Sequence, residues 1–254
     1  MFSRLHAVAA LTVLAVAVLA AYSWVIFRFE GLGPEFPLFW MWNCRLSFVE
    51  LLGKYVQFDK LWYRPSAFYL PYWMASPFVG WHHLAGWRLV HSLSVVPVCW
   101  GVYALTCRFF PGERVAGVLA ALYVAIYPGM YSIVLETSAF DNVHIVFVIA
   151  AVLLFDAAWR APETRRGAAA GAFLCGVAAL TAKESALIVP VYLAILTLRQ
   201  GRGNRWRWLA PYVALAAVYA AVHIRLMPGF GSEGDYRTAF NAETVGENLR
   251  KYPL

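Results

Sequence analysis

Seven apolar segments constrain the fold of this chain more than any other feature of its sequence. A helix needs about 20 mainly apolar residues to cross the hydrocarbon core of a bilayer. The segments are Leu5–Phe27, Leu89–Phe109, Ala116–Tyr131, Phe140–Trp159, Ala168–Ala182, Ser185–Leu198 and Trp208–Leu226. They lack the strict alternation of a barrel strand, and unpaired backbone groups cannot face lipid. The sequence therefore predicts an all-α integral membrane protein with about seven transmembrane helices.

Composition and charge agree with a membrane location. Hydrophobic residues make up 61% of the 254 residues and the mean hydropathy is +0.60, far above the averages for soluble domains. The net charge is +7, and its arginines concentrate at the amino end and in alternate connections: Arg4, Arg108, Arg114, Arg160, Arg165, Arg166, Arg199, Arg202, Arg205 and Arg207. This is the positive-inside pattern with a cytoplasmic amino end. The charge thus indicates topology, and no nucleic-acid partner is predicted. The four cysteines show neither a metal-ligand spacing nor a disulfide framework.

The chain divides into a membrane module and a tail. Residues 1–226 form the predicted polytopic module, in which residues 28–88 are the first non-cytoplasmic loop. Residues 227–254 form a polar non-cytoplasmic tail that leads toward a missing element or a partner subunit. The first apolar segment also fits a cleaved signal peptide. Its length favours a retained first span.

The first loop is predicted to carry interfacial helices. Phe36–Phe58 has apolar residues at helical spacing, which favours an amphipathic helix on the membrane surface, with an ordinary solvated loop as the alternative. Ser66–Trp87 is apolar but is broken by Pro71, Pro77 and two glycines. Because proline interrupts helices, this second stretch is interpreted as an interfacial or re-entrant piece that precedes the second span.

Charges in the middle of two long apolar stretches predict two hairpins. Ala116–Trp159 contains Glu136 and Asp141, and Ala168–Leu198 contains Lys183 and Glu184. Charge at the centre of a bilayer is costly, and arginines flank both stretches at each end. A hairpin keeps the arginines on one side and lifts the central charges to the other. Small residues at the start of the second hairpin, from Gly167 to Ala179, predict close helix packing.

The predicted topology collects carboxylates and cations at the non-cytoplasmic face. The carboxylates are Glu30, Glu35, Asp59, Glu136, Asp141 and Glu184, and Arg64 and Lys183 accompany them. A carboxylate can deprotonate an acceptor hydroxyl, and cations stabilise the charge that develops on a departing phosphate. This chemistry suits group transfer from a lipid-linked phosphate donor.

Four motifs resemble the GT-C class of polytopic glycosyltransferases, closest to the protein O-mannosyltransferase-like branch that includes enzymes with tetratricopeptide tails. They are WYRPSAFYL at 62–70, GWRLVHSLS at 86–94, DNVHIVFVIAAVLLF at 141–155 and LTAKESALIVPVYL at 180–193. The resemblance implies a seven-span conserved module, a catalytic carboxylate in the first outer loop and a polyprenyl-phosphate sugar as donor. Members usually carry an acidic pair just after the first span. Here that position is Phe29-Glu30-Gly31, with a single Glu.

The candidate bases are Glu30, Asp59 and Glu35, in that first loop. Each also has a structural interpretation. Glu30 alternatively marks the end of the first span, and Asp59 caps a helix or pairs with Lys60 or Arg64. Glu35 lies between Pro34 and Pro37, where a turn is expected.

Arg64, Lys183 and Glu184 are the candidate donor-phosphate residues, because the planar guanidinium can bind phosphate through two hydrogen bonds and the Lys-Glu pair matches the family best. Their alternatives are lipid-headgroup pairing for Arg64 and a structural ion pair for Lys183 and Glu184. Asp141 and Glu136 are candidates for acceptor binding or structure, and Asp141 also fits a helix N-cap. His82 and His83 are interpreted as interfacial structural residues, so no metal site is predicted, and participation of a divalent cation is left open.

Two functional hypotheses follow. In the first, the chain transfers a sugar from a polyprenyl-phosphate donor to a hydroxyl of a protein or glycan acceptor, at the outer face of a bacterial inner membrane. In the second it is non-enzymatic, either a GT-C-like assembly subunit or a lipid or sugar transporter. The transporter would bury Lys183, Glu184, Glu136 and Asp141 in the bilayer as an ion pathway.

Overall fold

The computed structural model describes residues 4–28, 46–56, 64–79, 84–127, 130, 142–160, 165–199 and 208–226, and every regular element within these ranges is a helix. In chain order the helices are α1 (Arg4–Arg28), α3 (Phe48–Val56), α4 (Pro65–Phe68), α5 (Leu70–Ala75), α6 (Leu84–Leu93), α7 (Val95–Phe109), α8 (Arg114–Ile126), α10 (Val143–Arg160), α11 (Arg165–Leu180), the 3₁₀ helix η1 (Glu184–Ile188), α12 (Val189–Arg199) and α13 (Ala210–Leu226). The all-helical prediction is confirmed for these residues.

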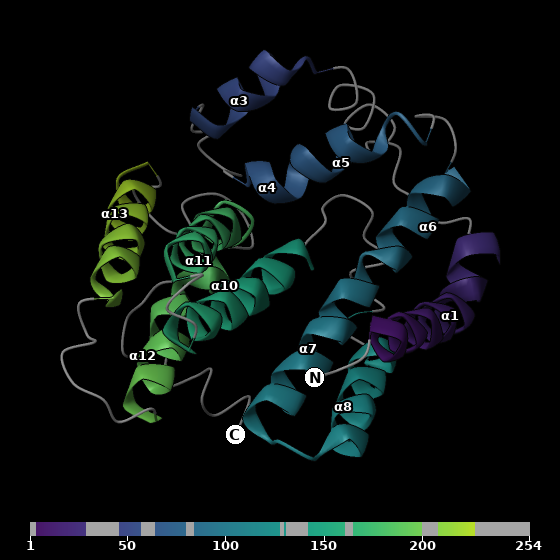
Figure 1. Cartoon of the computed structure of the whole chain (residues 1–254). Coiled ribbons are helices and arrows are strands. Elements are labelled where there is room, and N and C mark those ends of the chain that lie inside the picture. Colours follow the sequence, from purple (N-terminus) through teal and green to yellow (C-terminus); the bar gives the residue numbers. More distant parts are fainter. Residues whose placement is uncertain are drawn as a thin grey trace, which may run out of the picture.

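The long helices form two neighbouring groups (Figure 1). Helices α1, α6, α7 and α8 make one group, whose core contains the fully buried Val18, Tyr22 and Val98. Helices α10, α11, α12 and α13 make the other, whose core contains Phe155, Leu193 and Tyr212. Contacts of α7 with α10 join the groups. The short helices α3, α4 and α5 lie across one end of both.

Proline and glycine set several helix boundaries. The connection between α7 and α8 is a turn in which the Glu113 amide donates to the Phe110 carbonyl at 3.1 Å. Pro111 and Gly112 are its central residues, and Gly112 has a φ of +97°, as a type II turn requires. Tyr127 is extended because the next residue is Pro128, so α8 ends earlier than predicted. Pro190 cannot donate to the Ala186 carbonyl, and the predicted sixth helix is accordingly split into η1 and α12.

Small residues allow the helices to approach closely. A Cβ at Gly101 of α7 would lie 2.8 Å from Ile149 of α10, and one at Gly117 of α8 would lie 3.0 Å from Tyr103 of α7. On α11, a Cβ at Gly171 would lie 3.3 Å from Leu154 of α10. Ala172 and Ala179 of α11 are fully buried. The close packing predicted from the small residues of this segment is confirmed.

The apolar helices follow the order of the seven predicted segments. Two of them are long and apolar enough to cross a bilayer, Gly86–Phe109 and Val143–Arg160, and four shorter apolar helices cover Thr12–Ser23, Arg114–Ile126, Glu184–Leu198 and Ala210–Val222 within the described ranges. Large apolar side chains such as Leu119, Leu174 and Val218 are exposed. Lipid is the environment that would cover them. The number of seven spans itself stays a prediction.

Two local predictions need correction. The second span was expected to start at Leu89, after an irregular stretch that included Trp87, but α6 begins at Leu84 and runs into α7 through Ser94, which keeps helical angles. The turn of the second predicted hairpin contains Lys183 and Glu184, whereas the charged residues of the first lie outside the described residues, and the arms of the two hairpins are not the closest helix pairs. Helices α7 with α8 and α10 with α11 pack most extensively, because only four residues of sequence separate the members of each pair.

Helix α3 starts later than the predicted interfacial helix. The Ser47 amide and hydroxyl both donate to Glu50 at 2.7 Å, and the Glu50 amide donates back to the Ser47 hydroxyl at 3.3 Å. This reciprocal pattern is a capping box, which fixes a helix start at Phe48. Phe48, Val49, Leu52 and Val56 are exposed and apolar. The amphipathic character expected of this segment is thus present in the shorter helix.

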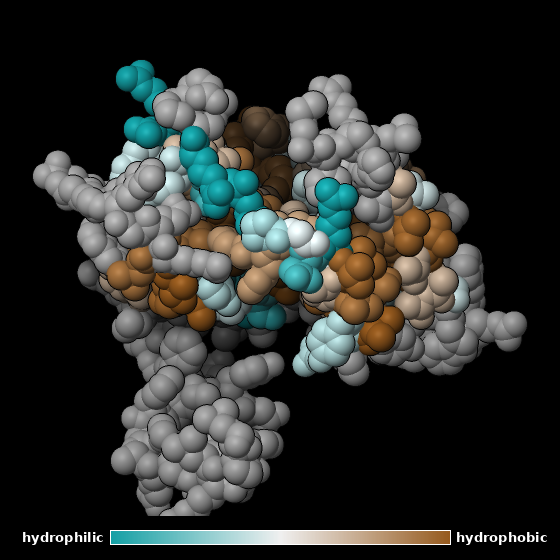
Figure 2. All heavy atoms as spheres, turned by 60° about the horizontal axis from the view of Figure 1, so that its bottom comes forward, coloured by the Kyte–Doolittle hydropathy of each residue, from teal (hydrophilic) through white to brown (hydrophobic). Residues whose placement is uncertain are grey.

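Arginines gather at the end of the bundle opposite α3, α4 and α5. Arg108 and Arg114 flank the α7–α8 turn, and Arg160, Arg165 and Arg166 flank the connection between α10 and α11. Figure 2 brings this end forward and shows hydrophilic residues crossing it between hydrophobic flanks. We call it the arginine end, and the opposite one the loop end. The grouping of these arginines agrees with the prediction, while five of the six carboxylates expected at the opposite face lie outside the described residues.

Candidate functional site

A paired arginine and glutamate join the first loop to the end of α11 at the loop end of the bundle. Arg64, which precedes α4, donates from Nε to Glu184 Oε1 at 3.1 Å and from Nη2 to Glu184 Oε2 at 2.8 Å. The two residues are 120 positions apart in the chain. Their side chains are 15% and 28% exposed, so the pair is partly shielded from water but open on one side. This two-point geometry is the strongest form of an arginine–carboxylate interaction.

Hydroxyl groups continue this connection. The Ser66 amide donates to the Thr181 carbonyl at 3.2 Å, and the Ser66 and Thr181 hydroxyls are 2.8 Å apart. The Tyr55 hydroxyl of α3 lies 3.3 Å from the Ser66 hydroxyl. Burial raises the pKa of Tyr55, while its contact with Ser66 acts in the opposite direction. We call Tyr55, Arg64, Ser66, Thr181, Lys183 and Glu184 together the Arg64 corner.

The turn after α11 positions the charged residues. The Thr181 hydroxyl donates to the Val177 carbonyl at 3.0 Å, which closes the last turn of the helix. Lys183 is extended, with φ −162° and ψ 142°, and its amide still donates to Ala179. Glu184 then begins η1. Lys183 and Glu184 therefore lie at a helix boundary, on the side of the bundle that α3 and α4 cover.

Aromatic contacts hold α3 over this corner. Phe48 and Trp73 have ring centroids 6.0 Å apart, and the Trp73 indole donates to the Leu46 carbonyl at 2.9 Å. The Lys54 ammonium lies 5.5 Å from the centre of the Tyr69 ring, within the range of a cation–π contact. Helix α3 is thereby tied to α4 and α5, with its apolar face exposed.

A buried polar layer lies beside the corner, where α5 meets α6. Tyr72 is fully buried, packs against Trp87 with a centroid distance of 5.2 Å, and approaches His91 Nε2 at 3.4 Å. The Asn142 amide donates to the Ser94 hydroxyl, which donates to the His91 carbonyl. These contacts fix the start of α10 against the junction of α6 and α7.

Only part of the predicted site lies in the described ranges. Arg64, Lys183 and Glu184, predicted as donor-phosphate residues, are brought together. The candidate bases Glu30, Glu35 and Asp59 and the residues His82, His83, Glu136 and Asp141 lie outside the described residues. Asp141 immediately precedes Asn142 in the chain. The described part contains no group of three or more His, Cys, Asp or Glu side chains arranged to hold a metal ion.

Sequence reasoning missed the uncharged members of the corner. Ser66 and Thr181 lie inside the motifs WYRPSAFYL and LTAKESALIVPVYL, two positions from the charged residues Arg64 and Lys183. Their hydrogen bonds connect those two motifs across 115 positions. The available signal was a hydroxyl residue two positions from a cation in each motif. The buried Tyr72, His91 and Asn142 carried no such signal, because their environment depends on tertiary packing.

A second ionic cluster lies at the arginine end. Asp156 of α10 is 1% exposed and accepts from Arg108 Nε at 2.5 Å and from Arg160 Nε at 3.0 Å. Arg108 lies in the last turn of α7, so this cluster joins the two helix groups. The arginine side chains are 37% and 51% exposed and reach from the buried carboxylate toward the surface. The carboxylate of this cluster is buried, whereas that of the Arg64 pair is partly exposed.

These features define a class of protein: within the described ranges, a bundle of apolar helices with short helices over a charged corner at one of its ends. The family model described as dolichyl-phosphate-mannose-protein mannosyltransferase matches residues 69–225, more than half of the chain. The chain belongs to this family and is a GT-C-type, mannosyltransferase-like module. No curated protein and no solved structure gives a significant match. The resemblance inferred from the motifs is confirmed, and with it the multi-pass membrane character.

Proposed function

We propose that this chain transfers a sugar from a polyprenyl-phosphate donor to a hydroxyl of a protein or glycan acceptor at the non-cytoplasmic face of a bacterial inner membrane. Family membership supports a membrane glycosyltransferase. The observation that carries the finer proposal is the Arg64 corner. It unites a first-loop cation with the Lys-Glu motif, at the end of the bundle opposite the arginines.

The corner has the chemistry to bind a lipid phosphate. A guanidinium carries five N–H donors in a fixed plane, and Glu184 accepts from Nε and Nη2 on one edge of that plane. Glu184 thus orients Arg64, while Lys183 adds a second cation from the same turn. In the proposed complex the donor phosphate accepts from Arg64 and Lys183. Its polyprenyl chain lies in the bilayer beside the apolar helices.

The proposed reaction is a single displacement. The acceptor hydroxyl oxygen attacks the anomeric carbon, the bond from that carbon to the phosphate oxygen breaks, and the configuration inverts. A first-loop carboxylate, Glu30 with Asp59 and Glu35 as alternatives, takes the hydroxyl proton. The polyprenyl phosphate leaves with both bonding electrons, and Arg64 and Lys183 stabilise its added negative charge.

The geometry of the corner weakens the transporter hypothesis. An ion pathway requires charges at mid-depth of spanning helices, whereas Lys183 and Glu184 lie at the boundary between α11 and η1 and contact the first loop. The non-catalytic subunit hypothesis is favoured by the single Glu at the position of the usual acidic pair. It predicts donor binding without transfer.

The experiment uses the full chain in proteoliposomes with dolichyl-phosphate-mannose as the donor probe and Ser/Thr-rich peptides as acceptors. We expect Arg64→Gln and Lys183→Gln each to lower kcat/KM by about 100-fold, the effect of removing one donor to a developing anion. Glu30→Gln should abolish release of the lipid phosphate while leaving donor affinity unchanged. Arg114→Gln, at the arginine end, is the matched control and should retain wild-type activity.

The outcomes separate the hypotheses. Wild-type affinity in Arg64→Gln and Lys183→Gln would remove the corner from donor binding. Donor binding with no release in the wild type would establish the subunit hypothesis instead. Full activity in Glu30→Gln, Asp59→Asn and Glu35→Gln would exclude a first-loop base.

A further inference from the structure

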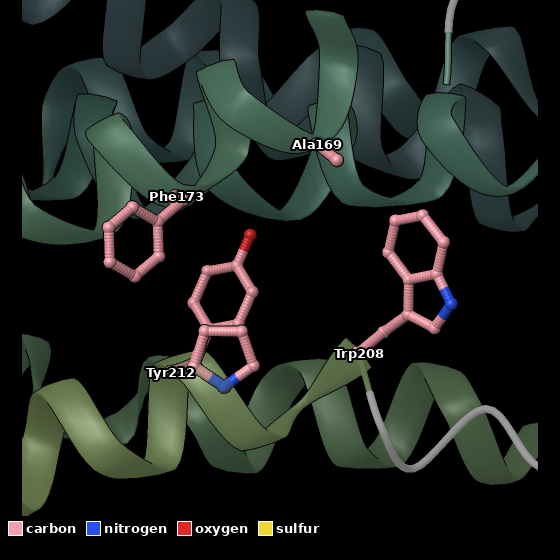
Figure 3. A pocket seen from close by; sticks show the side chains of 5 residues that line it. Ala169, Phe173, Trp208 and Tyr212 are labelled. Carbon is pink, nitrogen blue, oxygen red and sulfur yellow. The ribbon is translucent and has the colours of Figure 1, made fainter. Parts of the chain in front are cut away.

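An apolar cleft lies between α11 and α13. It has a volume of about 360 Å³ and is lined by Ala169, Phe173, Trp208, Pro211 and Tyr212. Figure 3 shows Phe173 and Trp208 on opposite sides of the opening, with Tyr212 between them and Ala169 on the α11 wall. The volume falls in the range of about 300–1,000 Å³ that is usual for small-molecule sites. The cleft is therefore large enough to hold part of a ligand.

Packing of the aromatic rings keeps this cleft in shape. Tyr212 is 5% exposed, meets Phe173 edge to face at 5.8 Å and meets Phe155 of α10 in the same way at 5.9 Å. A Cβ at Gly176 would lie 3.5 Å from the Tyr212 ring, so α11 lies close against it. Ala169, one turn before Phe173, has too small a side chain to fill the space between the rings. The floor is thus rigid, and the opening arises from one small residue.

The cleft opens on a surface of apolar character. Pro211 is exposed and Phe173 and Trp208 are half-buried, while Leu174 beside them is 66% exposed. Such a surface is the part of a membrane protein that meets acyl chains. The ligand that it suits is accordingly a hydrocarbon chain rather than a polar solute.

Positive charge borders this cleft on one side. The Arg165 guanidinium carbon lies 5.9 Å from the centre of the Trp208 ring, and both Arg165 and Arg166 are exposed at the start of α11. The cleft belongs to the arginine end. Ala169 and Leu180 are 11 positions apart on α11, which corresponds to about 16 Å along the helix axis at 1.5 Å per residue. The cleft is therefore remote from the Arg64 corner. Trp beside Arg is the arrangement expected where a helix meets lipid headgroups.

We infer that this cleft binds an anionic phospholipid, with one acyl chain between α11 and α13 and the headgroup phosphate at Arg165. Basic clefts between membrane helices on the positive side select anionic headgroups. The chain contacts Phe173, Pro211 and Tyr212, and the Trp208 ring lies at the level of the headgroup. The bound lipid stabilises the contact of α13 with α11. This site is separate from the proposed donor site, so either can fail without the other.

The experiment is native mass spectrometry of the full chain, titrated with phosphatidylglycerol or phosphatidylcholine of equal chain length. We expect saturable binding of phosphatidylglycerol, about fivefold tighter than that of phosphatidylcholine, from one basic residue at an anionic headgroup. Arg165→Gln should remove that fivefold preference. Ala169→Phe, which fills the opening, should weaken binding of both lipids, and the control Arg114→Gln should change neither.

Three results would overturn the inference. Equal binding of the two lipids to the wild type would show an apolar surface without headgroup selection. Displacement of phosphatidylglycerol by undecaprenyl phosphate at equal concentration would assign the cleft to the donor lipid. A dimer that Ala169→Phe converts to a monomer would show that a second copy of the chain covers the cleft. A thermal melt of Ala169→Phe is the folding check, and its paired variant Ala169→Ser should bind as the wild type does.

Discussion

The two ends of the bundle each hold an arginine–carboxylate cluster, but the clusters differ in burial. At the arginine end, Asp156 is 1% exposed and two guanidiniums hold it. At the loop end, Glu184 is 28% exposed and pairs with Arg64. The first cluster connects two packed helix groups, and the second connects a short loop helix to a turn.

This difference separates a structural cluster from a candidate site. A buried carboxylate that loses its partners keeps a large desolvation penalty, so the Asp156 cluster constrains the fold. A partly exposed pair costs less to open than a buried one, because water can solvate both of its charged groups. Arg64 can therefore take up a phosphate through its remaining N–H donors while Glu184 holds Nε and Nη2.

The largest expected effect is on stability at the arginine end. Arg108→Gln with Arg160→Gln removes two cations that hold the buried Asp156, and we expect a loss of about 3–5 kcal/mol in the free energy of unfolding. Thermal melts of the purified protein in detergent measure it. Adding Asp156→Asn to the same protein removes the buried charge and should recover part of the loss. If the double variant loses no stability, the buried cluster at the arginine end constrains the fold no more than the Arg64 pair does.

A smaller effect is expected from Glu184→Gln. Because this pair is partly exposed, its removal should change the free energy of unfolding by less than about 1 kcal/mol. The same melts provide the measurement, with Asp156→Asn as the matched change at the other end. A destabilisation as large as that of the buried cluster would mean that the Arg64 pair is structural and would leave the phosphate proposal without its physical basis.

The hydroxyl bridge between Ser66 and Thr181 should contribute about 1 kcal/mol, the usual net value of one hydrogen bond. We expect Ser66→Ala to raise amide exchange in residues 181–184, and Thr181→Val to produce the same change. The double variant should show an effect little larger than that of either single variant, since both substitutions remove the same hydrogen bond. Fully additive effects would show that the two hydroxyls act separately.

The smallest expected effect is the pH dependence of α3. Hydrogen bonds from the Ser47 amide and hydroxyl lower the pKa of Glu50 below its ordinary value of 4.5. A lowered folded-state pKa stabilises the helix above pH 4.5, and this contribution disappears as the pH falls through the lowered value. The protection factors of amides 48–52, which are corrected for the intrinsic pH dependence of exchange, should therefore fall in acid. Glu50→Gln should make those protection factors independent of pH in this window.

Sequence patterns predicted the helical architecture, because apolar length and arginine position act over whole segments. They also placed Arg64 and Glu184 at the same face, since a charged turn must leave the bilayer, but they did not predict that the two side chains pair with each other. Helix boundaries depend on local side-chain hydrogen bonds that apolar patterns do not reveal. The Ser47-x-x-Glu50 capping box, for example, fixes the start of α3. The lipid cleft was not predictable, because the open space beside Ala169 exists only once α13 packs on α11.

The central claim is that Arg64 meets the donor phosphate at the loop end. The charge swap Arg64→Glu with Glu184→Arg tests it most directly, because the ion pair is retained while the guanidinium moves to the other chain segment. Binding of undecaprenyl phosphate to the full chain in nanodiscs is the measurement, with thermal melts as the folding check. The account predicts affinity at least about tenfold weaker at unchanged stability. Wild-type affinity in the swapped protein would contradict it.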